Sequence, residues 1–300
     1  MPAPLLIGLD AGGTSTSALA VIDGEPAAFS GPGAQVLRDG VDAVAATLAD
    51  VIAEARSAFD GAPVGAVGVG VAGAGRAAAQ DALARALEPL LPDTPIAVTH
   101  DAEIALLAAW GGDSGALLIA GTGSNVYART HDGETVRAGG WGRLLGDDGS
   151  GTALGRAALR AVRAAADGGP PTALTDLAAD AGLAHPDDIT DAVYVDGRPL
   201  ATFAPLLLAA AAADDWVATA ILARETNALA QQAGWLATRT NDQVTPRIAY
   251  VGGLTKEDVY RAALDAALGR HLPGWTVGPS VVEPVVGALG LARQLLATAD

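Results

Sequence analysis

The chain has 300 residues, of which 50% are hydrophobic and 17% are charged, a globular composition long enough for one large or two medium domains. Its formal net charge of −16 argues against nucleic acids and anionic membranes as partners, although an acidic surface also serves solubility alone. The absence of cysteine excludes disulfides, iron–sulfur clusters, thiolate metal sites and cysteine nucleophiles.

The beginning of the sequence lacks the pattern of a signal peptide, because it has no basic segment and soon reaches Asp10. The nearest candidate for a membrane-spanning run, residues 203–213, is too short. We therefore expect a cytoplasmic protein that has no membrane partner.

In chain order, the first half of the sequence predicts four strands and three helices. The strands are expected at residues 5–9, 17–22, 64–71 and 96–99. The helices are expected at 40–58, at 76–91 and from just after Asp101 to about 110–112. Strands and helices in this order indicate a mixed sheet that is covered on both faces.

The second half begins with the same pattern as the first. An apolar strand (116–120), a polar turn (121–125) and a second strand (126–130) match the opening stretch 8–25 in order and spacing. Internal duplication and a chance similarity of two hairpins both remain open. The remaining elements are expected to be helices from 151 to about 239 with a looser segment at 167–199, a strand at 247–251 and a helix at 284–299.

The two hairpins share a turn that is built of glycine and hydroxyl residues. In the first hairpin this turn lacks the lysine of a Walker A loop and the spacing of a dinucleotide fingerprint. Such a tip presents N–H and O–H donors to phosphates, although one tip alone could be an ordinary tight turn. Two tips could grip one polyphosphate, and Asp10 would then lie near a phosphate-bound magnesium ion.

Three other stretches carry candidate site residues. Asp101 follows a predicted strand and begins an apolar helix, which suits either a helix N-cap or a catalytic base in an α/β fold. The pair Gly252-Gly253 also follows a strand, where it could leave room for a flat adenine ring or form an ordinary turn. The stretch "AGGWGRLLGDDGS" at 138–150 places a tryptophan and two carboxylates among glycines, which suits a polyhydroxylated ring.

Together these motifs resemble the N-acetylglucosamine kinase and BadF-type branch of the sugar kinase, heat-shock chaperone and actin superfamily. The first phosphate motif matches residues 9–16, the second matches residues 121–125, and the adenosine motif resembles residues 251–253. The stretch "GGWGRLLGDDGS" matches the signature of this branch, and Asp101 falls where the family keeps its catalytic aspartate. The likeness covers nearly the whole chain in the same order.

The resemblance implies an α/β fold of two ribonuclease-H-like (actin-like ATPase) domains, each with a mixed five-stranded sheet, around a central cleft. The expected domains are residues 1–112 and 113–288, with a final helix at about 289–300 that returns to the first domain. The second domain would carry a helical insertion and the adenosine site. A homodimer is implied by the resemblance alone.

The resemblance also implies roles for individual residues. Asp101 would be the catalytic base, and Asp10 would lie at the magnesium ion. The ATP-binding residues would be Gly12, Gly13, Thr14, Ser15, Thr16, Gly121, Thr122, Gly123, Gly252 and Gly253. The sugar-binding residues would be Gln35, Asp101, Ser124, Asn125, Gly140, Trp141, Gly142 and Asp147. Since Lys256 is the only lysine, backbone donors and magnesium are expected to serve the phosphates.

The expected activity is that of an ATP- and magnesium-dependent kinase that phosphorylates the 6-hydroxyl of an amino sugar. Members of this branch that take N-acetylglucosamine commonly carry an asparagine where this chain has residues 33–36, so we expect an altered pocket and glucosamine as the substrate. N-Acetylglucosamine is the alternative, because Gln35 could replace that asparagine with a longer amide. A second alternative is a non-catalytic, sugar-sensing regulator on the same fold.

Overall fold

The computed structural model describes residues 4–279 and 282–299 of the chain. Packing divides them into two compact units. Unit 1 contains the residues up to Ser114 together with the last helix, α11 (Pro284–Ala299), and unit 2 begins at Gly115. The whole of α11 belongs to unit 1, so the expected boundary at residue 288 falls inside this helix and not before it.

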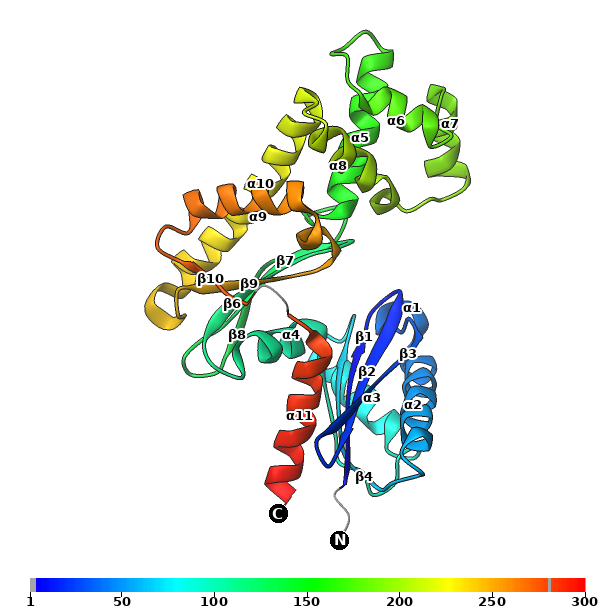
Figure 1. Ribbon diagram of the computed structural model, residues 1–300, viewed down its shortest axis with the longest axis vertical. Coiled ribbons are helices and arrows are strands. Elements are labelled where there is room, and N and C mark those ends of the chain that lie inside the picture. The colour runs from blue at the N-terminus through cyan, green and yellow to red at the C-terminus, as the bar shows by residue number, and fades with distance from the viewer. Residues whose placement is uncertain (1–3, 280–281, 300) are drawn as a thin grey trace. The chain divides into compact units, whose positions relative to one another are not determined.

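Unit 1 is built on a mixed five-stranded sheet with the strand order β3-β2-β1-β4-β5 (Figure 1). The antiparallel pairs are β1–β2 and β2–β3, and the parallel pairs are β1–β4 and β4–β5. The strands are β1 (Leu5–Ala11), β2 (Ser15–Ile22), β3 (Glu25–Pro32), β4 (Val64–Val71) and β5 (Ile96–His100). The sequence predicts all of them except β3, an edge strand without buried residues and therefore without an apolar pattern.

Helices cover both faces of this sheet. In addition to α11 they are α1 (Val36–Asp39), α2 (Val41–Ala58), α3 (Ala77–Leu87) and α4 (Asp101–Trp110). On one face, Leu48 of α2 and Leu83 of α3 share a hydrophobic cluster with Ile7, Leu9 and Val69 of the sheet. The helices α4 and α11 pack on each other and on the opposite face (Figure 1).

Glycines on the sheet let α11 and α4 approach this second face closely. Side chains at Gly8 of β1 and Gly68 of β4 would overlap the backbone of α11. A side chain at Gly70 of β4 would overlap Ile104 of α4. Gly68 and Gly70 thus leave the second half of β4 without side chains on this face, against which two helices pack.

Unit 2 contains a second five-stranded sheet with the order β10-β9-β6-β7-β8. Its strands are β6 (Gly115–Ala120), β7 (Ser124–Arg129), β8 (Thr135–Gly139), β9 (Arg247–Val251) and β10 (Thr276–Val277). The pairs β6–β7 and β7–β8 are antiparallel, and the pairs β6–β9 and β9–β10 are parallel. If β6–β10 are counted as first to fifth, both order and direction equal those of unit 1, so the two similar hairpins occupy equivalent places.

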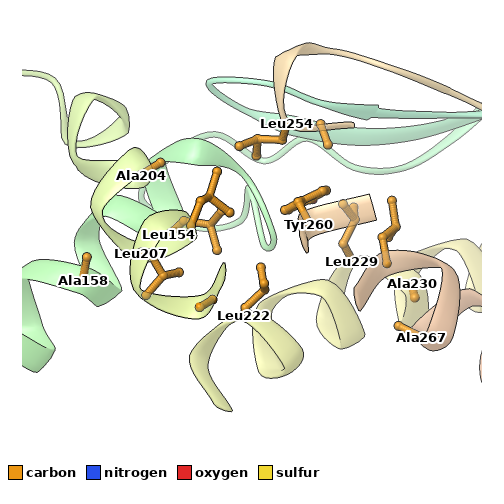
Figure 2. Packing of buried hydrophobic residues seen from close by; sticks show 14 of the residues in the cluster. Leu154, Ala158, Ala204, Leu207, Leu222, Leu229, Ala230, Leu254, Tyr260 and Ala267 are labelled. Atoms are coloured by element: carbon orange, nitrogen blue, oxygen red, sulfur yellow. The ribbon is translucent and has the colours of Figure 1, made fainter. Parts of the chain in front are cut away.

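The helices of unit 2 form its core with one face of this sheet. The long helices are α5 (Gly151–Ala166), α9 (Trp216–Thr240) and α10 (Asp258–His271), with α8 (Ala204–Ala212) between them. Figure 2 shows Leu154, Leu207, Leu229 and Tyr260 from these four helices meeting in one cluster. Tyr260 is fully buried in this cluster, and its hydroxyl donates to the backbone carbonyl of Gly149.

About half of the segment that is expected to be looser, residues 167–199, lies in short helical pieces. It contains α6 (Leu174–Asp180), α7 (Pro186–Thr190) and a π-helical turn at Asp191–Val195, and a 3₁₀ turn at Leu200–Phe203 follows it. Two further 3₁₀ turns lie at Asn241–Gln243 and Gly253–Lys256. The sequence prediction of a looser segment misses these helices, because helices of five to seven residues are too short to show a clear apolar period.

No single helix in the described residues is long and apolar enough to cross a membrane. The segments Leu200–Ala212 and Trp216–Gln243 meet the requirements of length and composition only as a pair, and this pair is bent by 118°. The part of the chain that the structure describes also contains no group of three or more histidine, aspartate or glutamate side chains that could hold a metal ion by itself.

Candidate active site

Two carboxylates of unit 1 lie at the same edge of its sheet. Asp10 is in β1, and it pairs across the sheet with Gly70 of β4, which in turn pairs with Thr99 of β5. Asp101 comes directly after β5, so the carboxyl ends of three parallel strands bring both side chains to one edge. Burial, and then the negative charge of Asp101, raise the pKa of Asp10 to about 6.

Asp101 is the first residue of α4, but it is not the cap of this helix. The cap is His100, whose imidazole accepts a hydrogen bond from the backbone N–H of Glu103. The Asp101 carboxylate accepts one from the N–H of Ala102 at 2.9 Å. Burial raises the pKa of Asp101, whereas the hydrogen bond from the Ala102 N–H opposes this shift. Since His100 caps the helix, the N-cap explanation of Asp101 is wrong.

The first hairpin joins β1 to β2 and has an exposed tip. The N–H of Gly12 donates to the carbonyl of Ser15 at 3.0 Å, which closes the turn around Gly13 and Thr14. Residues 13–15 are exposed, as a site for phosphates requires. Thr16 is different, because it is fully buried and its hydroxyl donates to the carbonyl of Pro32 at 2.7 Å. The structure therefore contradicts the expectation that the Thr16 side chain binds ATP.

Gln35 and Arg38 lie beside this first hairpin. The backbone N–H of Ala34 donates to the carbonyl of Gly12 at 2.9 Å, and Gln35 bridges to Ala72 after β4. The Arg38 guanidinium donates to the carbonyl of Gly13 at 2.7 Å. Sequence reasoning considered only lysines as cations for the phosphates and missed Arg38, for which the spacing to the glycines gave no signal.

The second hairpin, between β6 and β7, is joined to the N-terminus of α5. The N–H of Gly121 donates to the carbonyl of Gly123 at 2.9 Å, and Thr122 at the tip is exposed. The N–H groups of Gly151 and Thr152 donate to the carbonyls of Gly121 and Thr122. The helix therefore fixes the position of the tip, whose hydroxyl remains exposed.

Ser124 and Asp147 lie next to this second hairpin. Ser124 is buried, and its hydroxyl donates to the carbonyl of Asp148 at 2.7 Å, so its side chain joins two loops and is not presented to a sugar as expected. The carboxylate of Asp147 lies against Gly123, where an added Cβ would be 3.3 Å from it. Burial raises the pKa of Asp147, and the backbone N–H groups of Ser124 and Gly142 oppose this.

Residues 140–150, here called the tryptophan loop, contain the other expected sugar-binding residues. Gly140 has a φ of +66°, and a side chain on it would overlap the amide of Asn125. The Oδ1 atom of Asn125 is buried and has no hydrogen-bond partner in the described residues. Trp141 is 67% exposed, and Gly142 has open space around it, so these residues leave room for a ligand.

Three side chains from α9 and α10 hold the far end of the tryptophan loop. The Tyr260 hydroxyl donates to the carbonyl of Gly149 at 2.7 Å, and the Gly149 N–H donates to Glu225 at 3.4 Å. The amide of Gln232 donates to the carboxylate of Asp148 at 2.7 Å. Sequence reasoning missed these residues, because contacts between positions 76 to 111 residues apart leave no local pattern.

The glycine pair after β9 has two different environments. Gly252 has a φ of +116°, and a side chain there would overlap Ala120 of β6, so this glycine is required by the sheet itself. Gly253 has open space where a side chain would be. Only Gly253 therefore offers the room that a flat ring needs.

Each unit thus has the strand order of a ribonuclease-H-like domain with a glycine–hydroxyl hairpin between its first two strands, the class of fold found in actin-like ATPases. The chain belongs to the BadF/BadG/BcrA/BcrD ATPase family, whose model matches residues 7–292. The resemblance and the fold class read from the sequence are confirmed.

Relatives and solved structures match most of the chain. It is 26% identical over 314 residues to the N-acetyl-D-glucosamine kinase of Dictyostelium discoideum, covering 97% of this chain and 98% of that protein. It is 38% identical over 97 residues to the N-acetylmuramic acid/N-acetylglucosamine kinase of Clostridium acetobutylicum, which is 32% of each protein. A solved structure from Chromobacterium violaceum, provisionally named an N-acetylglucosamine kinase, has a TM-score of 0.75 and 28% identity over 98% of this chain and 99% of that one.

Proposed function

We propose that this protein is an ATP-dependent amino-sugar kinase that transfers the γ-phosphate to the 6-hydroxyl of N-acetylglucosamine. The observation that carries the proposal is the partly buried Asp101 carboxylate, at the sheet edge that also holds Asp10 and the first hairpin, in a member of an ATPase family. Full-length similarity to the Dictyostelium kinase supports the sugar. Glucosamine, which the sequence prediction preferred, becomes the second candidate.

In the proposed reaction, Asp101 accepts the proton of the sugar 6-hydroxyl while the hydroxyl oxygen attacks the γ-phosphorus and ADP leaves. A carboxylate whose pKa is raised by burial is a better base than an exposed one. Phosphoryl transfer also depends strongly on the alignment of the nucleophile, and the helix start fixes the position of Asp101.

Asp10 fits a position near magnesium. Partial burial, and then the negative charge of Asp101, raise the pKa of Asp10, and a divalent cation would favour the charged forms of both partly buried carboxylates. Magnesium bound with ATP neutralises phosphate charge in this class of reaction. Asp10 would hold it largely through water, since the described residues supply no cluster of three ligands.

The remaining roles are assigned to residues that are exposed or that have open space around them. Thr14, Ser15 and Thr122 at the hairpin tips would donate to phosphates, and Gly253 would lie beside the adenine. Arg38, whose guanidinium lies at the first hairpin, would supply a positive charge to the phosphates. The proposed sugar-binding residues are Gln35, Asp101, Asn125, Gly140, Trp141, Gly142 and Asp147, without Ser124.

The surroundings of Gln35 bear on the choice of sugar. A Cβ placed on Gly13 would lie 3.5 Å from the Gln35 amide oxygen and 3.8 Å from the Arg38 guanidinium, so the two groups flank the same glycine. A guanidinium disfavours the ammonium group of glucosamine, whereas an amide suits an acetamido group. The salt bridge between Arg38 and Asp39 weakens this effect, and for that reason glucosamine stays a candidate.

The ratios of kcat/KM for N-acetylglucosamine, glucosamine and glucose test this proposal. We expect N-acetylglucosamine to be preferred over glucose by roughly a hundredfold or more, since a site built for an amide leaves buried polar groups unpaired with glucose. A higher kcat/KM for glucosamine would make glucosamine the substrate. No turnover of ATP with any amino sugar would favour the non-catalytic regulator instead.

Replacing Gly140 by alanine is expected to raise the KM for the sugar more than replacing Gly142 does. Both glycines have positive φ values, +66° and +80°, so either alanine costs roughly 1–2 kcal/mol in backbone strain. Only at Gly140 would the methyl group overlap Asn125, because nothing lies within 4 Å of the Cβ position at Gly142. Similar melting temperatures with different KM values would support a role of Gly140 and Asn125 in sugar binding, and equal KM values would contradict it.

A further inference from the structure

A pocket of about 380 Å³ lies within unit 2, between the tryptophan loop, the end of β8 and the second half of α9. The polar and aromatic side chains that line it are Arg137, Trp141, Asp148, Gln232, Trp235 and Arg239. Only Trp141 has a role in the proposed reaction. The pocket adjoins the proposed sugar-binding residues through the Gly139-Gly140 pair, since Gln232 packs against Gly139 and Asn125 against Gly140.

The inner part of this pocket is polar and incompletely hydrogen-bonded. Gln232 is only 6% exposed, and its amide nitrogen donates to Asp148 at 2.7 Å, which fixes the direction of the carboxylate. The amide oxygen of Gln232 has no hydrogen-bond partner in the described residues. This oxygen lies against Gly139 and is closed off from the pocket, whereas the partly buried Asp148 carboxylate lines the pocket and has acceptor capacity left for the hydroxyl groups of a ligand.

The outer part of the pocket combines indole rings with positive charge. Trp141 and Trp235 are 67% and 61% exposed, an unusual exposure for two tryptophans at one pocket. The Arg137 guanidinium lies 5.8 Å from the centre of the Trp141 ring, and Arg239 donates to the backbone carbonyl of Arg137. Neither arginine forms an ion pair with a carboxylate in the part of the chain that the structure describes.

These groups together match one class of ligand. Indole rings pack on the apolar face of a sugar ring, and carboxylate oxygens accept its hydroxyl hydrogens. Guanidinium groups bind phosphate by paired, charge-assisted hydrogen bonds. A carboxylate inside and two guanidinium groups at the rim would therefore orient a molecule with hydroxyls at one end and a phosphate at the other.

We propose that this pocket binds a phosphorylated sugar. The ligand would be a sugar phosphate like the product of the proposed reaction, so its identity rests on the proposed function. Trp141 and Asp148 line the pocket, and both are adjacent in the loop to Gly142 and Asp147, which are proposed to bind the substrate. A ligand in the pocket would therefore lie beside the proposed sugar-binding residues and share Trp141 with them.

Titration calorimetry of the full chain with N-acetylglucosamine 6-phosphate tests this. The catalytic site is first filled with N-acetylglucosamine and a non-hydrolysable ATP analogue. We expect one equivalent of the sugar phosphate to bind, and Arg239→Gln and Trp235→Ala to weaken this binding about tenfold or more. The matched controls, Arg160→Gln on α5 and Trp216→Ala on α9, are exposed and lie outside the pocket, so they should bind as the unmodified protein does.

No binding to the filled enzyme, or equal binding by Arg239→Gln, Trp235→Ala and their controls, would overturn the proposal. Displacement of the sugar phosphate by higher concentrations of N-acetylglucosamine would also overturn it, because the pocket would then be the substrate site. Binding that depends on Arg239 in a protein that phosphorylates no amino sugar would support the pocket and refute the proposed function. The two proposals therefore fail separately.

Discussion

Replacing Asp101 by asparagine is expected to lower kcat by roughly 10²–10⁴-fold, the usual contribution of a general base. Asparagine has the same shape and can still accept the hydrogen bond from the Ala102 N–H, so α4 should begin as before. Binding of ATP and sugar should change little, because the variant removes proton acceptance and leaves the other contacts. Rapid-mixing kinetics and calorimetric binding measure the two effects separately.

The control for this variant is Asp81→Asn, which changes an exposed carboxylate on α3 of the same unit. It should leave kcat unchanged. A kcat within a fewfold of normal in the Asp101 variant would remove this residue from the mechanism. A loss of sugar binding as large as the loss of kcat would instead assign it to substrate binding alone.

Replacing Asp10 by asparagine is expected to abolish turnover and yet to stabilise the protein above pH 6. The pKa of Asp10 is raised from 3.8 to about 6 in the folded protein, a difference worth at most about 3 kcal/mol. Between these values the folded protein binds more protons than the unfolded chain, so the free energy of unfolding falls as the pH rises through this window. Asparagine carries no charge at any pH and avoids this loss.

Thermal melts at pH 4 and pH 7.5 without magnesium measure the prediction. The Asp10→Asn variant should melt at a higher temperature than the unmodified protein at pH 7.5, and the difference should shrink at pH 4, where Asp10 is protonated in the folded protein and its charge no longer has to be buried. The Asp81→Asn control should show no such difference. A lower melting temperature of the Asp10 variant at pH 7.5 would contradict the strain that we attribute to the two carboxylates.

The buried strands of both sheets are predictable from the sequence, since β1, β4, β6 and β9 are apolar runs that end at glycines or polar residues. The edge strands β3 and β8 are not, because their exposed residues are free to be polar. The same limit applies to α6 and α7, whose few turns show no clear period. The sequence shows the repeated hairpin but leaves duplication and chance similarity open, whereas the structure shows that the two units share one sheet topology.

The candidate site is predictable as a set of motifs, but not residue by residue. Thr16 and Ser124 belong to the motifs, and yet their hydroxyls hold the fold together, because strand alternation turns them inward. Arg38 and Gln232 have no motif, since they reach their partners through the tertiary fold. Motif membership thus predicts the location of a site better than the role of each side chain in it.

The most direct test of the central proposal is to follow the reaction of the protein with ATP, magnesium and N-acetylglucosamine by phosphorus NMR. The account predicts that ADP and a sugar phosphate form in equal amounts, with the new phosphorus signal coupled to the two protons of carbon 6. Formation of no sugar phosphate, or hydrolysis of ATP to free phosphate alone, would contradict it.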